Sequence, residues 1–173
     1  LIAATQHTVE LRALAGASLG GPIIALAAGL VVVAALSRSA QIPFHRWLPA
    51  TLAAPTPVSA LLHAGVVNAG GVLQIKLSPV VTSSGVVQAL IILAGLATLA
   101  YGAAIMLAKP DIKGALAHST MAQMGFMILT CGLGLWAAAV FHLVAHGFYK
   151  ATLFLSSGSA IAYRRRKRSL PPA

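Results

Sequence analysis

The sequence contains very little negative charge. Glu10 and Asp111 are its only acidic residues, against twelve lysines and arginines in a chain of 173 residues. Charged residues of both signs make up only 8% of the chain, whereas a soluble domain carries about 25%. Together with 58% hydrophobic residues and a mean hydropathy of +0.89, this scarcity excludes an ordinary soluble domain. It indicates an integral membrane protein, or a section of one.

Cysteine and the common cofactor motifs are also scarce. Cys131 is the only cysteine, so neither a disulfide framework nor a cysteine-based metal site can form within the chain. The sequence has no H-E-x-x-H, no Walker loop and no G-x-G-x-x-G, and no spacing that would hold a flavin or an iron–sulfur cluster. We therefore expect no redox or hydrolytic centre, no bound cofactor and no metal site in this chain.

Long apolar runs, by contrast, are plentiful, and five of them are about long enough to cross a membrane as helices. They cover residues 20–36, 58–80, 86–108, 114–130 and 135–163. We therefore predict an all-α, polytopic membrane protein with five transmembrane helices. The mildly polar residues 1–19 are expected to form a surface loop that ends in a short amphipathic helix. Because the chain begins at Leu1 without a signal peptide, we expect it to be a fragment of a longer chain.

Prolines and glycines interrupt the predicted helices at two places. Four prolines fall within fifteen residues, at Pro43, Pro49, Pro55 and Pro57. Each lacks a backbone donor and restricts the residue before it, so residues 42–56 are predicted to be a broken or partly unwound connection. The second apolar run contains three glycines, Gly65, Gly70 and Gly71. They indicate either close helix packing or a kink.

The basic residues alternate with the predicted crossings. Basic residues lie in every second connection between the predicted helices: first Arg38 and Arg46, then Lys109 and Lys113, and finally Arg164 to Arg168. The connections in between contain no basic residue. This is the positive-inside pattern, so we expect a membrane domain over residues 1–163 and a basic cytoplasmic tail over residues 164–173. The orientation signal is favoured over a nucleic-acid-binding patch, and contact with anionic lipid could add to it.

Three titratable residues stand four apart in the last apolar run, at His142, His146 and Lys150. On a helix each step of four turns about 40° and rises about 6 Å, so the three form one polar ladder. A lysine near the middle of a membrane helix costs about 2.5–3.5 kcal/mol on insertion scales. The ladder indicates a buried proton or ion path. The ordinary alternative is a lysine that reaches an interface and histidines that bond backbone carbonyls of neighbouring helices.

Further polar residues lie in the predicted membrane segments. His63 and His118 are there, and so are residues suited to holding water, namely Asn68, Gln74, Ser119, Thr120 and Gln123. Histidine titrates near neutral pH, which suits proton transfer. For His63 a relay role and an ordinary helix–helix hydrogen bond are both open, whereas for His118, near a charged turn, we favour the hydrogen bond.

Several sequence blocks also carry a family resemblance. S-A-Q-I-P-F-H-R-W-L-P at residues 39–49 and A-P-T-P-V-S-A-L-L-H at 54–63 come first. They are followed by D-I-K at 111–113, A-H-S-T-M-A-Q-M-G-F at 117–126, F-H-L-V-A-H-G-F-Y-K at 141–150 and F-L-S-S-G at 154–158. In this order, over nearly all of residues 20–159, they resemble the antiporter-like membrane subunits shared by respiratory complex I (NADH-quinone oxidoreductase) and the Mrp cation/proton antiporters.

Within that family, the blocks at residues 63–71, 123–127 and 153–159 most resemble the DabB branch, the membrane subunits of bacterial inorganic-carbon accumulation systems. The resemblance implies a proton-translocating subunit of the bacterial inner membrane that acts with a DabA-like zinc protein similar to β-carbonic anhydrase. One alternative is a translocase subunit of complex I or of an Mrp antiporter, with other membrane subunits as partners. A non-conducting scaffold that only docks a partner is the other.

The resemblance also assigns roles to individual residues. It implies a proton relay of Lys150, His146, His142 and His63. Arg38 stands where the family has a lysine at a helix break, and since arginine holds its proton far more firmly, a fixed charge is expected there. An earlier glutamate and a later lysine of the family have no counterpart. The chain would cover the end of one and the start of the other of two inverted repeats, within a larger antiporter-like bundle.

Overall fold

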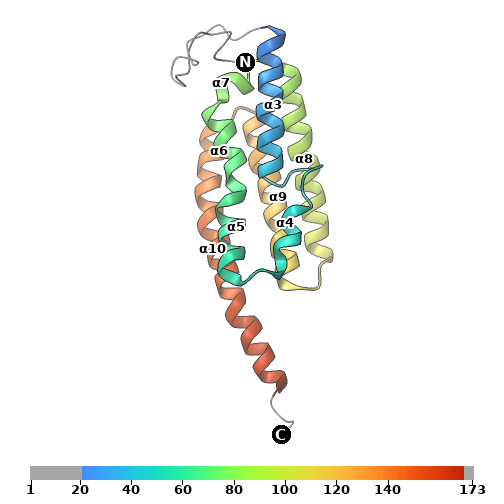
Figure 1. The fold of residues 1–173 in the computed structure, drawn as a ribbon, viewed down its shortest axis with the longest axis vertical. Helices are drawn as coiled ribbons and strands as arrows, with labels where there is room; N and C mark the ends of the chain where they lie inside the picture. Colours follow the sequence, from blue (N-terminus) through green and yellow to red (C-terminus); the bar gives the residue numbers. More distant parts are fainter. Residues whose placement is uncertain (1–20, 170–173) are drawn as a thin grey trace.

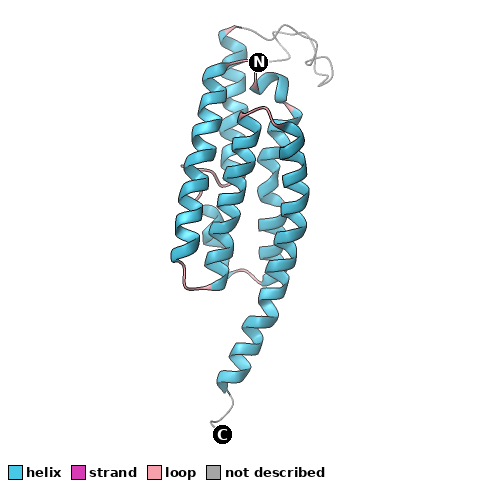
Figure 2. Ribbon diagram, turned by 180° about the vertical axis from the view of Figure 1, so that it is seen from behind, coloured by secondary structure: helices cyan, strands magenta, loops and turns pink. Residues whose placement is uncertain are grey.

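The computed structural model describes residues 21–169 as an elongated bundle of helices (Figures 1 and 2). Its long columns are α3 (Pro22–Arg38), α5 (Thr56–Ala64) continued by α6 (Ala69–Lys76), α8 (Gly85–Ala108), α9 (Ile112–Gly132) and α10 (Trp136–Ser169), with the short α7 (Ser78–Val81) between α6 and α8. No strand occurs in the described part of the chain. The all-α prediction is confirmed, while the loop and amphipathic helix predicted for residues 1–19 lie outside the described residues.

Three helical columns are long and apolar enough to cross a membrane, namely Thr56–Lys76, Gly85–Ala108 and Trp136–Ser159. Helix α3 is apolar but shorter, with 17 residues. Helix α9 has 21 residues and corresponds to the remaining predicted span. It packs along α8 and also against α10, so its polar side chains face protein instead of lipid.

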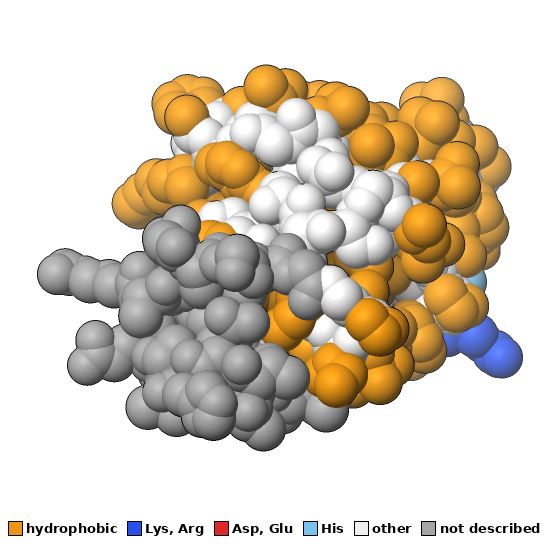
Figure 3. Space-filling model, turned by 90° about the horizontal axis from the view of Figure 1, so that it is seen from above, with side chains coloured by type: hydrophobic (Ala, Val, Ile, Leu, Met, Phe, Trp, Pro, Cys, Tyr) orange, Lys and Arg blue, Asp and Glu red, His pale blue; other side chains and the backbone are white. Residues whose placement is uncertain are grey.

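The outer surface of the bundle is apolar. Seen along the long axis, hydrophobic side chains form most of the visible perimeter (Figure 3). Large exposed ones include Leu26, Leu93, Phe141 and Phe148. An apolar surface of this kind matches the lipid that surrounds a membrane protein.

The proline-rich connection is broken, as predicted. Helix α3 ends at Arg38, and irregular backbone leads to the short helix α4 (Trp47–Ala50) and a 3₁₀ turn, η1 (Thr51–Ala53). Side chains replace the hydrogen bonds that the break removes. Ser39 Oγ donates to the carbonyl of Val67 at 2.7 Å, and the backbone N–H of Ile42 donates to Thr98 Oγ1 at 3.0 Å. Backbone groups at membrane depth need such internal partners.

The second apolar column is broken as well, and one of its glycines packs closely against a neighbouring helix. Helix α5 ends at Ala64, a 3₁₀ turn, η2 (Val66–Asn68), follows, and α6 begins at Ala69. A Cβ atom at Gly70 would collide with the carbonyl oxygen of Ala35 in α3. The glycines therefore permit close packing against α3 at the place where η2 interrupts the column.

Lys113 joins the first turn of α9 to the proline-rich connection. Its ammonium group donates to the carbonyls of Ala54 at 2.8 Å and Leu52 at 3.2 Å. These carbonyls lie where η1 ends and Pro55 offers no donor. We expect Lys113→Met to lower the free energy of unfolding by about 1.5 kcal/mol, the value of a hydrogen bond to a charged group.

Denaturant unfolding of the full-length parent in detergent would measure this loss. Lys109→Met is the matched control, because Lys109 is exposed at the same turn and its amine has no hydrogen bond among the described residues. The control should change the unfolding free energy by less than about 0.5 kcal/mol. Equal effects of the two changes would contradict a specific role for Lys113.

The basic run lies on helix rather than on a separate extended tail. Helix α10 continues to Ser169 and projects beyond the rest of the bundle (Figure 1). A cytoplasmic position for residues 164–173 stays a prediction that rests on the distribution of basic residues.

Candidate functional site

Lys150 is fully buried in the interior of the bundle, with a relative exposure of 0%. Its Nζ donates to Ser119 Oγ at 2.8 Å and to the carbonyl of Leu116 at 3.3 Å, both in α9. The side chain therefore does not extend to an interface. An ammonium group has three donors, so one remains after these two bonds. Asp111, the one acidic residue in the described part of the chain, is exposed and caps α9 by accepting from Gly114 N.

His63 projects from α5 and is also fully buried. Its ring stacks on Phe154 of α10, with centroids 4.4 Å apart and an interplanar angle of 23°. Neither of its ring nitrogens has a hydrogen-bond partner among the residues that the structure describes. The ordinary expectation of a hydrogen bond across helices is not met for this histidine.

His146 and His142 lie one turn apart on α10, as the spacing of four predicts. Their rings stack with centroids 5.7 Å apart and an interplanar angle of 17°. His146 is 4% exposed, and both of its ring nitrogens lack a partner. His142 is half-buried, packs against Phe126 of α9 and has an unpartnered Nε2.

The structure thus brings the four predicted relay residues into one cluster. His142, His146 and Lys150 share one side of α10, and His63 of α5 stacks on Phe154, one turn after Lys150 in the same helix. Buried polar groups in native proteins pair with protein groups or with ordered water, and the unpaired ring nitrogens are therefore suited to bind water. Imidazole can accept a proton at one nitrogen and release one from the other, so a proton could pass along this cluster. That role stays a prediction.

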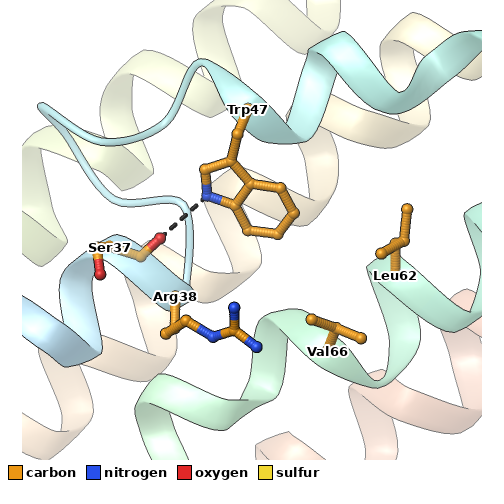
Figure 4. Close-up of a pocket in the computed structure, with 5 residues that line it drawn as sticks. All are labelled: Ser37, Arg38, Trp47, Leu62 and Val66. Atoms are coloured by element: carbon orange, nitrogen blue, oxygen red, sulfur yellow. Dashed lines mark hydrogen bonds between the residues drawn. The ribbon is translucent and has the colours of Figure 1, made fainter.

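Arg38 is not part of the cluster. It is exposed at the C-terminal end of α3 and lines a pocket of about 400 Å³ with Ser37, Trp47, Leu62 and Val66 (Figure 4). Trp47 Nε1 donates to the carbonyl of Ser37 at 3.0 Å across this pocket. Helix α3 ends partway along the bundle (Figure 1), so Arg38 stands at the helix break. No acidic residue of the described part lies beside it.

Sequence reasoning missed some neighbours of the cluster. Ser119 was expected only to hold water, yet it is the hydrogen-bond partner of Lys150. Nothing in the local sequence indicates that Phe154 stacks on His63, because the contact depends on how α5 and α10 align. His118 makes a hydrogen bond as expected, but within its own helix, with Nδ1 2.8 Å from the carbonyl of Gly114. No group of three possible metal ligands occurs among the described residues.

Comparison with known proteins places this arrangement in context. A family model described as "NADH:quinone oxidoreductase/Mrp antiporter, TM" matches residues 1–171. The chain is 49% identical to the probable inorganic carbon transporter subunit DabB1 of Halothiobacillus neapolitanus, over 88% of this chain and 27% of that protein. It is 47% identical to NAD(P)H-quinone oxidoreductase subunit 5, chloroplastic, of Poa pratensis, over 79% of this chain and 20% of that protein.

A solved structure of an Mrp complex has the same fold over most of this chain. The chain superimposes on part of the Mrp complex from Dietzia sp. DQ12-45-1b with a TM-score of 0.81 and 35% identity, over 91% of this chain and 18% of the matched chain. The chain thus spans less than a third of the length of each of these proteins. Because the family model covers nearly the whole chain, this protein belongs to the NADH:quinone oxidoreductase/Mrp antiporter family of membrane subunits.

Proposed function

We propose that the chain is a section of a proton-translocating subunit of the bacterial cytoplasmic (inner) membrane. Protons would move along Lys150, His146 and His142, joined through water to His63, and Arg38 would contribute a fixed charge at the break after α3. The observation that carries the proposal is the burial of the Lys150 ammonium group against Ser119 with no acidic partner among the described residues. A buried cation without a counter-charge is costly, which favours a functional reason for its position.

The spacing of the cluster suits stepwise transfer. Each imidazole has one nitrogen that accepts and one that donates, and the rings of His142 and His146 lie 5.7 Å apart, a separation that one water can bridge. A positive charge on one of the four residues disfavours a second charge nearby. The cluster would therefore carry protons one at a time.

The proposal also concerns the process to which proton movement is coupled. We favour inorganic-carbon accumulation, in which proton entry drives a DabA-like zinc protein to convert CO₂ to bicarbonate. Support comes from the 49% identity to a protein named as a probable inorganic carbon transporter subunit.

A second candidate is a subunit of complex I or of an Mrp antiporter, in which redox change or cation exchange drives the proton. The Mrp structural match at 35% identity and the chloroplast quinone oxidoreductase subunit at 47% identity favour it. The same residues would then move protons that are coupled to a different process. A non-conducting scaffold is the third candidate, and absence of proton flux through the full-length parent would favour it.

The partner distinguishes the first two candidates. We expect the tagged full-length parent, purified in mild detergent, to bring with it a large soluble protein that contains zinc, detected by mass spectrometry and metal analysis. A zinc protein is expected because hydration of CO₂ needs an activated water, which bound zinc supplies. Flavin or iron–sulfur subunits, or further antiporter-like membrane subunits, would contradict the inorganic-carbon assignment.

A further inference from the structure

Asn68 stands where the broken column α5–α6 meets α10, next to the histidine–lysine cluster. We propose that it is a positioning residue of the relay, whose side-chain oxygen holds a water against His146. The inference rests on the proton-relay function proposed above and adds a residue that comes from the helix break. Four steps of geometry support it.

The first step is the orientation of the Asn68 amide. Its Nδ2 donates to the carbonyl of Ala64 at 2.8 Å. Because a carbonyl only accepts, the NH₂ group must face Ala64 and the oxygen must face the other way. Asn68 is 7% exposed, and its Oδ1 is buried without a hydrogen-bond partner. The acceptor is therefore free and directed into the protein.

The second step is that the Asn68 side chain does not cap the helix that follows it. It occupies the position before the first residue of α6, where an asparagine oxygen commonly accepts from a backbone N–H of the first turn. Here the side chain makes no such cap, and its backbone has helical angles of φ −72° and ψ −15°. The turn η2 continues directly into α6, so capping gives no reason for an asparagine at this position.

The third step is the contact with α10. A Cβ atom built on Gly147 would lie 3.8 Å from Asn68 Nδ2 and 3.3 Å from the carbonyl oxygen of Ala64. The amide nitrogen of Asn68 therefore lies beside Gly147 of α10. The residue before Gly147 in α10 is His146, which is 4% exposed and has two ring nitrogens without a hydrogen-bond partner among the described residues. The missing side chain at Gly147 lets the carbonyl of Ala64, to which this amide donates, approach α10 closely.

The fourth step is the alignment of the two columns. Near the other end of the contact, a Cβ atom on Gly158 would lie 2.8 Å from Thr56 Oγ1. The two contacts fix α5–α6 and α10 as antiparallel neighbours. At about 1.5 Å per residue, this alignment places His63 level with Lys150 and Asn68 level with His146. The column α5–α6 thus supplies a polar group at successive levels of the relay.

An amide suits this position for a chemical reason. Asparagine does not titrate, so it can orient a water without retaining the proton that passes. A water that donates to Asn68 Oδ1 can accept from one ring nitrogen of His146 or donate to it. The alternative is that Asn68 only satisfies the carbonyl of Ala64, which the break leaves free.

The test compares Asn68→Leu with the full-length parent in proteoliposomes. Leucine has the same number of side-chain heavy atoms as asparagine, in the same branched arrangement, but no acceptor. We expect proton flux per folded molecule to fall on the order of tenfold, because misplacing a transfer partner by about 1 Å has effects of this size or larger. Asn68→Ser, which keeps an oxygen, should restore flux toward the parental value. Ala69→Leu is the matched control, since Ala69 is exposed, and should leave flux unchanged.

A spectroscopic measurement separates positioning from a structural role. In protein labelled with ¹⁵N-histidine, Asn68→Leu should shift the ring ¹⁵N signals of His146, assigned by their loss in His146→Gln, whereas Ala69→Leu should not. Parental flux, or an unchanged His146 signal, would overturn the proposal. If Asn68→Leu does not fold, Asn68→Ala, whose smaller side chain also lacks the acceptor, gives the same two readouts.

A second variant distinguishes failure of the Asn68 proposal from failure of the relay proposal. If Lys150→Met stops flux while Asn68→Leu changes neither flux nor the His146 signal, only the role of Asn68 is wrong. If Lys150→Met leaves flux intact, the relay is wrong, and with it the role of Asn68.

Discussion

Lys150→Met is expected to abolish proton flux through the full-length parent while the protein stays folded. Methionine has a similar length and is apolar, so it can fill the fully buried site that the lysine stem occupies. It cannot carry a proton or donate to Ser119. Loss of a proton-transfer group lowers rates by about 100-fold or more. Proton uptake into proteoliposomes, normalised to folded protein, measures the effect.

Two further variants sharpen this result. Lys150→Arg keeps the positive charge but holds its proton far more firmly, so flux should also be lost. Lys76→Met is the matched control, because Lys76 is exposed near the end of α6. Transport by Lys150→Met at the parental rate would contradict the relay, and equal losses in Lys150→Met and Lys76→Met would show that the effect is not specific to the buried amine.

Gly125→Ala is expected to lower the free energy of unfolding by about 3 kcal/mol, near the upper end for overpacking. A Cβ atom at Gly125 would lie 2.5 Å from the backbone nitrogen of Leu99 in α8. The opposite glycine is equally enclosed, since a Cβ atom at Gly95 would lie 2.7 Å from Leu129 N. Both neighbours are backbone atoms, so α8 and α9 must separate to admit even one carbon.

Close helix pairs in membranes depend on such small residues, because lipid gives no hydrophobic force for association. Reversible unfolding in detergent would measure the loss. Gly29→Ala is the matched control, since a Cβ atom there has nothing within 4 Å and alanine favours helix by about 1 kcal/mol. A destabilised Gly29→Ala together with an unaffected Gly125→Ala would contradict the packing argument.

The sequence by itself determined the helical class and the places where helices break. Apolar runs of membrane length need internally satisfied backbone, and closely spaced prolines cannot continue a helix. It also determined that His142, His146 and Lys150 share one side of α10, because a spacing of four residues returns to the same face. These properties depend on neighbours along the chain.

Contacts between helices were decided only by the tertiary structure. Ser119 meets Lys150, and Phe154 meets His63, because of how α9 and α5 align with α10. The fold places Arg38 exposed at the end of α3, apart from the buried cluster. Asn68 lies beside Gly147, the residue after His146, because of how the break between α5 and α6 aligns with α10. Helix periodicity fixes which face a residue occupies, whereas packing fixes which residue of the next helix lies at the same level.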